Sequence, residues 1–241
     1  MAMTGSDRFE YVRPLRPLHF PVEAKVPESQ RHLELRTALY QLLSFHLEGK
    51  ASVGSDQFLY FDASDPKACL APDVFLQLGS DGPEIDSWKT WERGTPDLAV
   101  EIASRSDAPD EPWRLKLERY HRLGVRELVR FNQRARHKLR IWDYVDGDLA
   151  ERKLAPEVPA WCRVLGLFWV IESDERWGPM LRLAHDAEGT RLVQTRLESE
   201  IAARKAEAEA RKAEAEARKI AEARVRELEQ TLLALRAKER E

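Results

Sequence analysis

The stretch GTPDLAVEIAS, residues 94–104, decides the fold that we predict for this chain. Successive side chains of a strand point to opposite faces, so Leu98, Val100 and Ile102 share one face. The other face carries Glu101 between two alanines, which leave open space around its carboxylate. A carboxylate in the middle of a half-buried strand is unfavourable unless something pairs with it. The stretch therefore predicts a sheet strand that carries a candidate functional residue.

A second carboxylate comes from DVFLQL, residues 73–78, where Asp73 begins another predicted strand directly after a proline. Two carboxylates from adjacent strands can hold one Mg²⁺ together with several waters. Such an ion activates water and stabilises the charge that develops on a phosphate. The alternative is structural: Asp73 is then a turn residue, and Glu101 pairs across the sheet with an arginine.

Asp97 shares the face of Glu101, but four residues of a strand span roughly 13 Å, too far for both to bind one ion comfortably. We expect Asp97 to hydrogen-bond the end of a loop or to support the site from outside the ligand set.

Helical and strand patterns surround these two stretches. A helix is expected to begin after Ser29 as N-cap and to stop near Gly49, and a second helix to run from Trp113 to Leu123. Residues 79–95 are expected to form a long loop. The order predicts an α/β (α+β) domain over residues 29–190, with a mixed central sheet flanked by helices, after an extended, proline-rich lead-in over residues 1–28. The remaining strands are expected at 57–61, 98–103, 127–131 and 138–145.

The second predicted helix places Lys116 on the border of its apolar stripe, from which the ammonium could reach the carboxylates. The alternative is a lysine on a solvated face. Residues 113–140 hold ten Lys or Arg against two Glu, although the whole chain has a net charge of -3. This basic stretch is expected to contact a nucleic-acid backbone, through Arg114, Arg119, Arg122 and Arg126.

The tail, residues 194–241, repeats RKAEAEA at 204–210 and 211–217 and continues as RKIAEAR at 218–224. Without Gly or Pro, it is predicted to be one long helix. One apolar seam consists of Ala206, Ala210, Ala213, Ala217 and Ile220, and a second of Ala221, Val225, Leu228, Leu232 and Leu235. The seams predict a coiled coil with a second copy or another helical partner, and the alternative is a solvated single helix.

Three motifs resemble the Uma-type restriction endonuclease family over about residues 25–180: LAPDVFLQLG (70–79), SWKTWERGTPDLAVEIAS (87–104), and the run from Lys116 through Tyr120 to Glu127. The resemblance implies a PD-(D/E)XK nuclease fold with an acidic metal site. Asp73 matches the first acidic position and Glu101 the second. Ala103 stands where the ExK motif has its lysine, a role that the resemblance moves to Lys116, and Glu34 matches the helix acid of that fold.

The chain departs from the family pattern between Glu101 and Lys116, where it reads SRSDAPDEPWRLK with Arg105, Asp107 and Pro112 at unusual positions, and again at Asn132. Two functions are therefore weighed. The first is a Mg²⁺- or Mn²⁺-dependent endonuclease that acts on nucleic acid, which we expect to be DNA. The second is a catalytically idle nuclease fold that serves as a scaffold and oligomerises through its tail. A scaffold has no need of Asp73 and Glu101 at one site.

Other classes fit poorly. Two distant cysteines without a CxxC pattern disfavour a disulfide scaffold or a zinc ribbon. The histidines show neither HxH nor HExxH spacing, and no glycine-rich phosphate loop or serine elbow occurs. The N-terminus lacks the apolar run of a signal peptide, and no stretch of 18 apolar residues occurs, so a cytoplasmic location without membrane contact is expected.

Overall fold

The computed structural model describes residues 18–19, 29–79, 85–103, 111–155 and 159–238. The chain forms two compact units, Met1–Leu192 and Val193–Glu241. The lead-in predicted for residues 1–28 lies almost wholly outside the described residues, as does the loop of residues 104–110.

A six-stranded mixed sheet forms the centre of the first unit. Its strand order is β1-β4-β6-β7-β8-β9, with β6 and β7 parallel and every other neighbouring pair antiparallel. Residues 98–102, within the stretch that decides the predicted fold, therefore form a central strand that is paired on both sides. The strands are β1 (Ala51–Gly54), β4 (Val74–Leu78), β6 (Leu98–Ile102), β7 (Glu127–Phe131), β8 (Leu139–Val145) and β9 (Asp148–Glu151).

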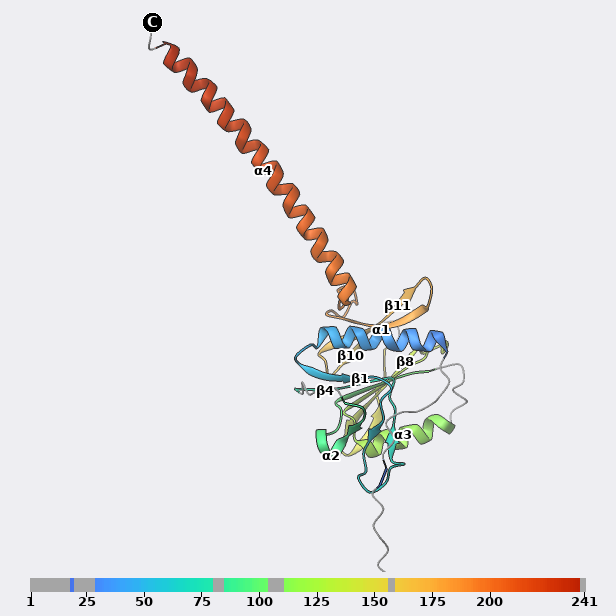
Figure 1. The fold of residues 1–241 in the computed structure, drawn as a ribbon. Helices are drawn as coiled ribbons and strands as arrows, with labels where there is room; N and C mark the ends of the chain where they lie inside the picture. The colour runs from blue at the N-terminus through green and yellow to red at the C-terminus, as the bar shows by residue number, and fades with distance from the viewer. Residues whose placement is uncertain (1–17, 20–28, 80–84, 104–110, 156–158, 239–241) are drawn as a thin grey trace, which may run out of the picture. The chain divides into compact units, whose positions relative to one another are not determined.

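Two helices cover opposite faces of this sheet, α1 (Gln30–His46) and α3 (Glu111–Leu123) (Figure 1). Ser29 caps α1 as predicted, because its Oγ accepts a hydrogen bond from the His32 amide. Gly124 ends α3 with a φ of +75°, and its amide donates to the Tyr120 carbonyl. The mixed α/β fold class predicted from the sequence is thus confirmed.

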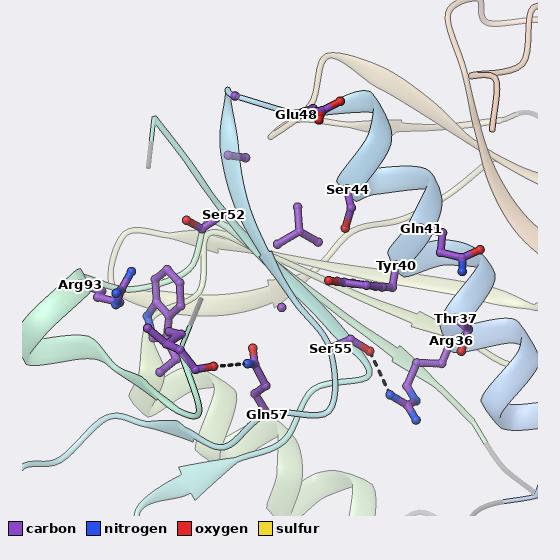
Figure 2. A pocket seen from close by; sticks show the side chains of 16 residues that line it. Arg36, Thr37, Tyr40, Gln41, Ser44, Glu48, Ser52, Ser55, Gln57 and Arg93 are labelled. Atoms are coloured by element: carbon purple, nitrogen blue, oxygen red, sulfur yellow. Dashed lines mark hydrogen bonds between the residues drawn. The ribbon is translucent and has the colours of Figure 1, made fainter. Parts of the chain in front are cut away.

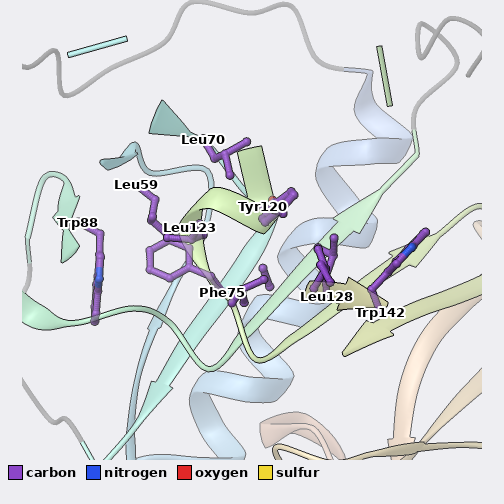
Figure 3. Close-up of a cluster of buried hydrophobic side chains, with 11 residues drawn as sticks. Leu59, Leu70, Phe75, Trp88, Tyr120, Leu123, Leu128 and Trp142 are labelled. Atoms are coloured by element: carbon purple, nitrogen blue, oxygen red, sulfur yellow. The ribbon is translucent and has the colours of Figure 1, made fainter. Parts of the chain in front are cut away.

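The core between the sheet and α3 is a cluster of buried apolar side chains (Figure 3). Tyr120 and Leu123 of α3 pack there with Phe75 of β4, Leu128 of β7 and Trp142 of β8. Ala99 of β6 belongs to the same cluster. Since residues two apart on a strand share a face, Glu101 also faces α3.

Several short elements differ from the sequence predictions. β1 has no apolar alternation and was not predicted, because its pairing with β4 defines it. The strand expected at 57–61 shortens to β2 (Leu59–Tyr60). The expected loop at 79–95 contains β5 (Trp88–Lys89) and α2 (Thr90–Arg93). With β3 (Cys69–Leu70), β2 and β5 form a separate small sheet, so long-range pairing creates these strands.

A third sheet consists of β10 (Ala160–Cys162), β11 (Leu167–Asp174) and β12 (Gly178–Ala184). Buried charged side chains join the loop between β10 and β11 to the central sheet. Glu127 of β7, fully buried, accepts a hydrogen bond of 3.0 Å from the Val164 amide. Arg152 bridges Glu127 and the buried Asp143 of β8.

The second unit contains the predicted long helix, α4 (Arg196–Lys238). A reciprocal pair begins it: the Thr195 Oγ1 accepts from the Glu198 amide, and the Glu198 carboxylate accepts from the Thr195 amide. Pairs such as Arg211–Glu207 and Arg218–Glu222 lie along its surface. Leu197, Ile201, Ile220, Val225 and Leu228 are each more than half exposed.

Both cysteines are free. Among the described residues, no helix combines the length and apolar character that crossing a bilayer requires.

Candidate active site

The pairing of β4 with β6 brings the two predicted carboxylates together. Val74 lies opposite Val100, and the same register continued by one residue places Asp73 opposite Glu101. Asp73 is 8% exposed and Glu101 is 6% exposed. The Asp73 Oδ2 accepts a hydrogen bond of 2.5 Å from the Ile102 amide, which fixes its carboxylate at the end of β6. Two acidic side chains are therefore buried side by side.

Helix α3 supplies a hydrogen-bond donor to each oxygen of Glu101. The Lys116 Nζ lies 2.5 Å from Oε2, and the Tyr120 hydroxyl donates to Oε1. Lys116 and Tyr120 are four residues apart, so one face of the helix presents both. The Lys116 side chain is 36% exposed, whereas Tyr120 is fully buried. The ammonium thus links the buried carboxylate to the surface.

The electrostatics of the pair oppose full ionisation. Burial raises the pKa of Glu101 to about 7, the Lys116 ammonium acts in the opposite direction, and the neighbouring Asp73 carboxylate raises it again. Burial beside Glu101 raises the pKa of Tyr120 well above its usual value, so the phenol stays a donor at neutral pH. A carboxyl group poised near neutrality is typical of functional sites.

Helix α1 reaches the same place through His32. Its Nε2 lies 2.7 Å from the Ile102 carbonyl oxygen and 3.3 Å from the Asp73 Oδ1. The tautomer with a proton on Nε2 donates to that carbonyl. No spacing pattern in the sequence pointed to His32, because its partners lie on strands far along the chain. Its position one turn before the buried Leu35 and two turns before the buried Leu39 is the signal that could have found it.

Asp97 and Glu34 lie outside this cluster. The Asp97 Oδ2 accepts from the Leu78 amide at 2.8 Å, and its Oδ1 accepts from Arg126 at 2.8 Å. Asp97 therefore hydrogen-bonds the end of β4, and its support of the site from outside the ligand set stays a prediction. Glu34 is half-buried on α1 and makes no hydrogen bond or ion pair in the described part of the chain, and its match to the helix acid stays a prediction.

The four arginines predicted to contact nucleic acid are exposed on α3 or just after it. Arg114 pairs with Glu118 at 2.6 Å, and Arg126 pairs with Asp97. Arg122 lies 3.9 Å from Asp62 and over the Phe61 ring. Burial raises the pKa of the Cys69 thiol, and the Arg119 guanidinium acts in the opposite direction. Acidic neighbours thus partly neutralise the positive charge of the basic stretch, residues 113–140.

The donor set fits a hard divalent cation better than zinc. Mg²⁺ takes oxygen ligands and is usually bound through one or two carboxylates with retained waters. Asp73 and Glu101 supply such carboxylates, and an ion between them would relieve the repulsion that raises the pKa of Glu101. Within the described ranges, no group of three His, Cys, Asp or Glu side chains is arranged as a complete metal cage.

Comparison with known proteins identifies the family of this chain. Residues 22–172, more than half of the chain, match the family model "Uma2: Putative restriction endonuclease". The chain belongs to the Uma2 family. The resemblance stated from the three motifs is therefore confirmed, and the Uma2 match includes Asp73, Glu101 and Lys116.

A solved structure is also similar to this Uma2 chain: "Crystal structure of a putative nuclease belonging to DUF820 from Anabaena variabilis ATCC 29413". The two share 9% sequence identity with a TM-score of 0.43, over 58% of this chain and 75% of that one. Among curated proteins, none matches the chain.

Proposed function

We propose that this chain is a divalent-metal-dependent endonuclease that hydrolyses phosphodiester bonds in DNA. The observation that carries the proposal is the pair of buried carboxylates, Asp73 and Glu101, on neighbouring strands with the Lys116 ammonium at Glu101. Burying two acids side by side destabilises a fold unless they are compensated. Family membership supports the same reaction class.

Each residue of the site has a distinct role. Asp73 and Glu101 would hold Mg²⁺ or Mn²⁺, which when bound polarises a phosphoryl oxygen and lowers the pKa of a water. The Tyr120 hydroxyl holds one oxygen of Glu101 in place, and the Ile102 amide holds one oxygen of Asp73. Lys116, which is partly exposed, positions the scissile phosphate or the attacking water.

DNA contacts are assigned to Arg114, Arg119, Arg122 and Arg126. Arg114, Arg122 and Arg126 form ion pairs through exposed guanidinium groups. Exposed pairs are worth only ~0–1 kcal/mol, so a phosphate can displace the acidic partner. Each phosphate contact releases counterions, and binding should weaken steeply with salt.

Calorimetry with Mn²⁺ and a plasmid-nicking assay test the proposal together. Wild type is expected to bind the ion and nick the plasmid, and Glu101→Gln to lose both. Glu118→Gln, on the exposed side of α3, makes the same chemical change and should lose neither. Nicking that survives in Glu101→Gln would refute the assignment.

A second candidate is the idle scaffold. It is favoured by one observation: both Glu101 oxygens already have donors within the protein. A wild-type protein that neither binds Mn²⁺ nor nicks DNA would support it.

We also propose that α4 associates with a second copy of this chain. Ile220, Val225 and Leu228 are each more than half exposed. Exposed apolar side chains that recur along one helix are typical of an interaction surface.

A further inference from the structure

A ridge of side chains along α1 leads from the carboxylate pair into a groove. His32, Arg36, Tyr40 and Ser44 follow one another at intervals of four residues, which places them on one inclined ridge. At 1.5 Å per residue the ridge is about 18 Å long. His32 contacts the site, and the other three line a groove of about 620 Å³ between α1 and the edge strand β1 (Figure 2).

The groove is rich in hydrogen-bond donors. Tyr40 and Ser44 extend from α1 toward β1 (Figure 2), and Ser52 and Gln57 lie on the opposite wall. Arg36 and Arg93 bring two guanidinium groups, whereas Glu48 is the one carboxylate among its described lining residues. The Ser44 Oγ is shielded from solvent and has no hydrogen-bond partner in the described part of the chain. Arginine, hydroxyl and amide groups are those that contact the phosphates and sugars of nucleic acids.

One end of the groove is connected to the candidate active site by hydrogen bonds. The Arg36 Nη1 donates to the Ser55 Oγ at 3.1 Å, and the Ser55 Oγ donates to the Asp73 carbonyl oxygen at 2.7 Å. A chain lying in the groove would therefore arrive beside Asp73.

We propose that this groove binds the backbone of a single DNA strand next to the scissile phosphate. The inference rests on the proposed endonuclease function and adds a substrate subsite to it. A groove of this volume is comparable to pockets for small ligands, which are roughly 300–1,000 Å³, and we therefore assign it to one extended strand rather than to a duplex. Tyr40, 36% exposed, offers a face on which a base can stack.

Fluorescence anisotropy tests the subsite with full-length protein, without divalent ions, and with a labelled oligothymidine or a labelled duplex. The double variant Tyr40→Ala, Arg93→Gln is expected to lose at least about tenfold in affinity for the single strand. Its affinity for the duplex, bound through the α3 arginines, should change less than about twofold. The matched control, Tyr144→Ala with Arg176→Gln, alters an equally exposed tyrosine and an arginine on the β11–β12 turn. It should change neither affinity.

Unchanged single-strand binding, or an equal loss for both probes, would overturn the subsite. Hydrogen exchange on the wild type gives the same decision if the variant does not fold. Oligothymidine should slow exchange in residues 51–55, and protection by an extended peptide instead would assign the groove to a peptide. Plasmid nicking by the wild type separates the two hypotheses. If the wild type nicks the plasmid and the double variant still binds the single strand with wild-type affinity, only the subsite is rejected. If the wild type does not nick the plasmid, the endonuclease function itself is rejected.

Discussion

The pKa of Glu101 is set by opposing effects that nearly balance at neutral pH. Burial and the neighbouring Asp73 favour the protonated carboxyl, whereas Lys116 and the Tyr120 hydroxyl favour the carboxylate. Because the balance lies at a pKa of about 7, small changes in the surroundings alter the charge of the group.

Tyr120→Phe removes one donor from Glu101 and leaves the packing of the ring in place. The hydrogen bond from Tyr120 lowers the pKa of Glu101, so its loss should raise that pKa and move the pH dependence of nicking to higher pH. We expect about a tenfold slower reaction at pH 7 and about 1–2 kcal/mol lower stability. Tyr144→Phe, at an exposed position, is the control for both measurements. An unshifted pH profile would contradict the role of Tyr120.

Mn²⁺ should stabilise the protein more at pH 8 than at pH 6. A pKa raised to about 7 means that the metal-free folded protein keeps the Glu101 proton below that pH and becomes destabilised as pH rises through it. An ion must displace that proton at pH 6 but not at pH 8. Thermal melts with and without Mn²⁺ measure the difference, and Glu101→Gln should abolish it. Equal shifts of Tm at both pH values would argue against Glu101 as a ligand.

How far the site could be predicted depends on the kind of signal each residue leaves in the sequence. Glu101 stood out because a charge interrupts an apolar strand, and Asp73 and Lys116 followed from motifs around it. His32 left no such signal, because its contacts are with Asp73 and Ile102, which only the fold brings near. The catalytic roles of all these residues stay predictions.

At the scale of elements, strands with their own apolar pattern were predictable and strands defined by a partner were not. β7 was predicted with its observed bounds, since Leu128, Val129 and Phe131 are buried on a strand paired on both sides. β5 has only two residues and depends on its parallel pairing with β2. Long-range pairs of this kind leave little trace in local sequence.

Arg152→Met tests how the third sheet is joined to the central one. Arg152 donates to Asp143 at 2.8 Å and lies 3.5 Å from Glu127, so its loss removes from two buried carboxylates the one cation that bridges them. We expect a loss of about 3–5 kcal/mol at pH 7 in chemical denaturation. Burial already raises the pKa of Glu127, and the variant raises it further, so the deficit should grow as pH increases above about 4.5.

Arg163→Met is the matched control, because Arg163 also contacts Asp143, at 3.5 Å, but is 59% exposed. Its loss should cost no more than ~1 kcal/mol. Similar losses for both variants would mean that the buried bridge contributes little.

At the scale of the whole molecule, the two seams of α4 differ in the charges beside them. In the heptads around Ala210 and Ala213, the flanking residues are glutamates on both sides: Glu207, Glu209, Glu214 and Glu216. Two copies would therefore repel one another along this part. Beside Val225 and Leu228 the flanking residues are Arg224 and Glu229, which face each other with opposite charge in a parallel pair.

A parallel dimer through the later seam is therefore expected, and its charges can be exchanged. Arg224→Glu should weaken self-association by about two- to tenfold, and the double variant Arg224→Glu, Glu229→Arg should restore it. Sedimentation of the full-length chain measures both, with circular dichroism to verify that the helix persists. A wild-type monomer at all concentrations would remove the dimer from consideration.

The two donors to Glu101 both lie on α3, one helical turn apart, and this has an evolutionary consequence. A change in the number of residues between the end of β6 at Ile102 and the start of α3 at Glu111 leaves the spacing of the two donors along the helix unaltered. A single residue gained or lost between Lys116 and Tyr120 rotates one donor by about 100° relative to the other. An alignment of relatives should therefore place its gaps in the first interval and leave the second ungapped, even where the residues between them have diverged.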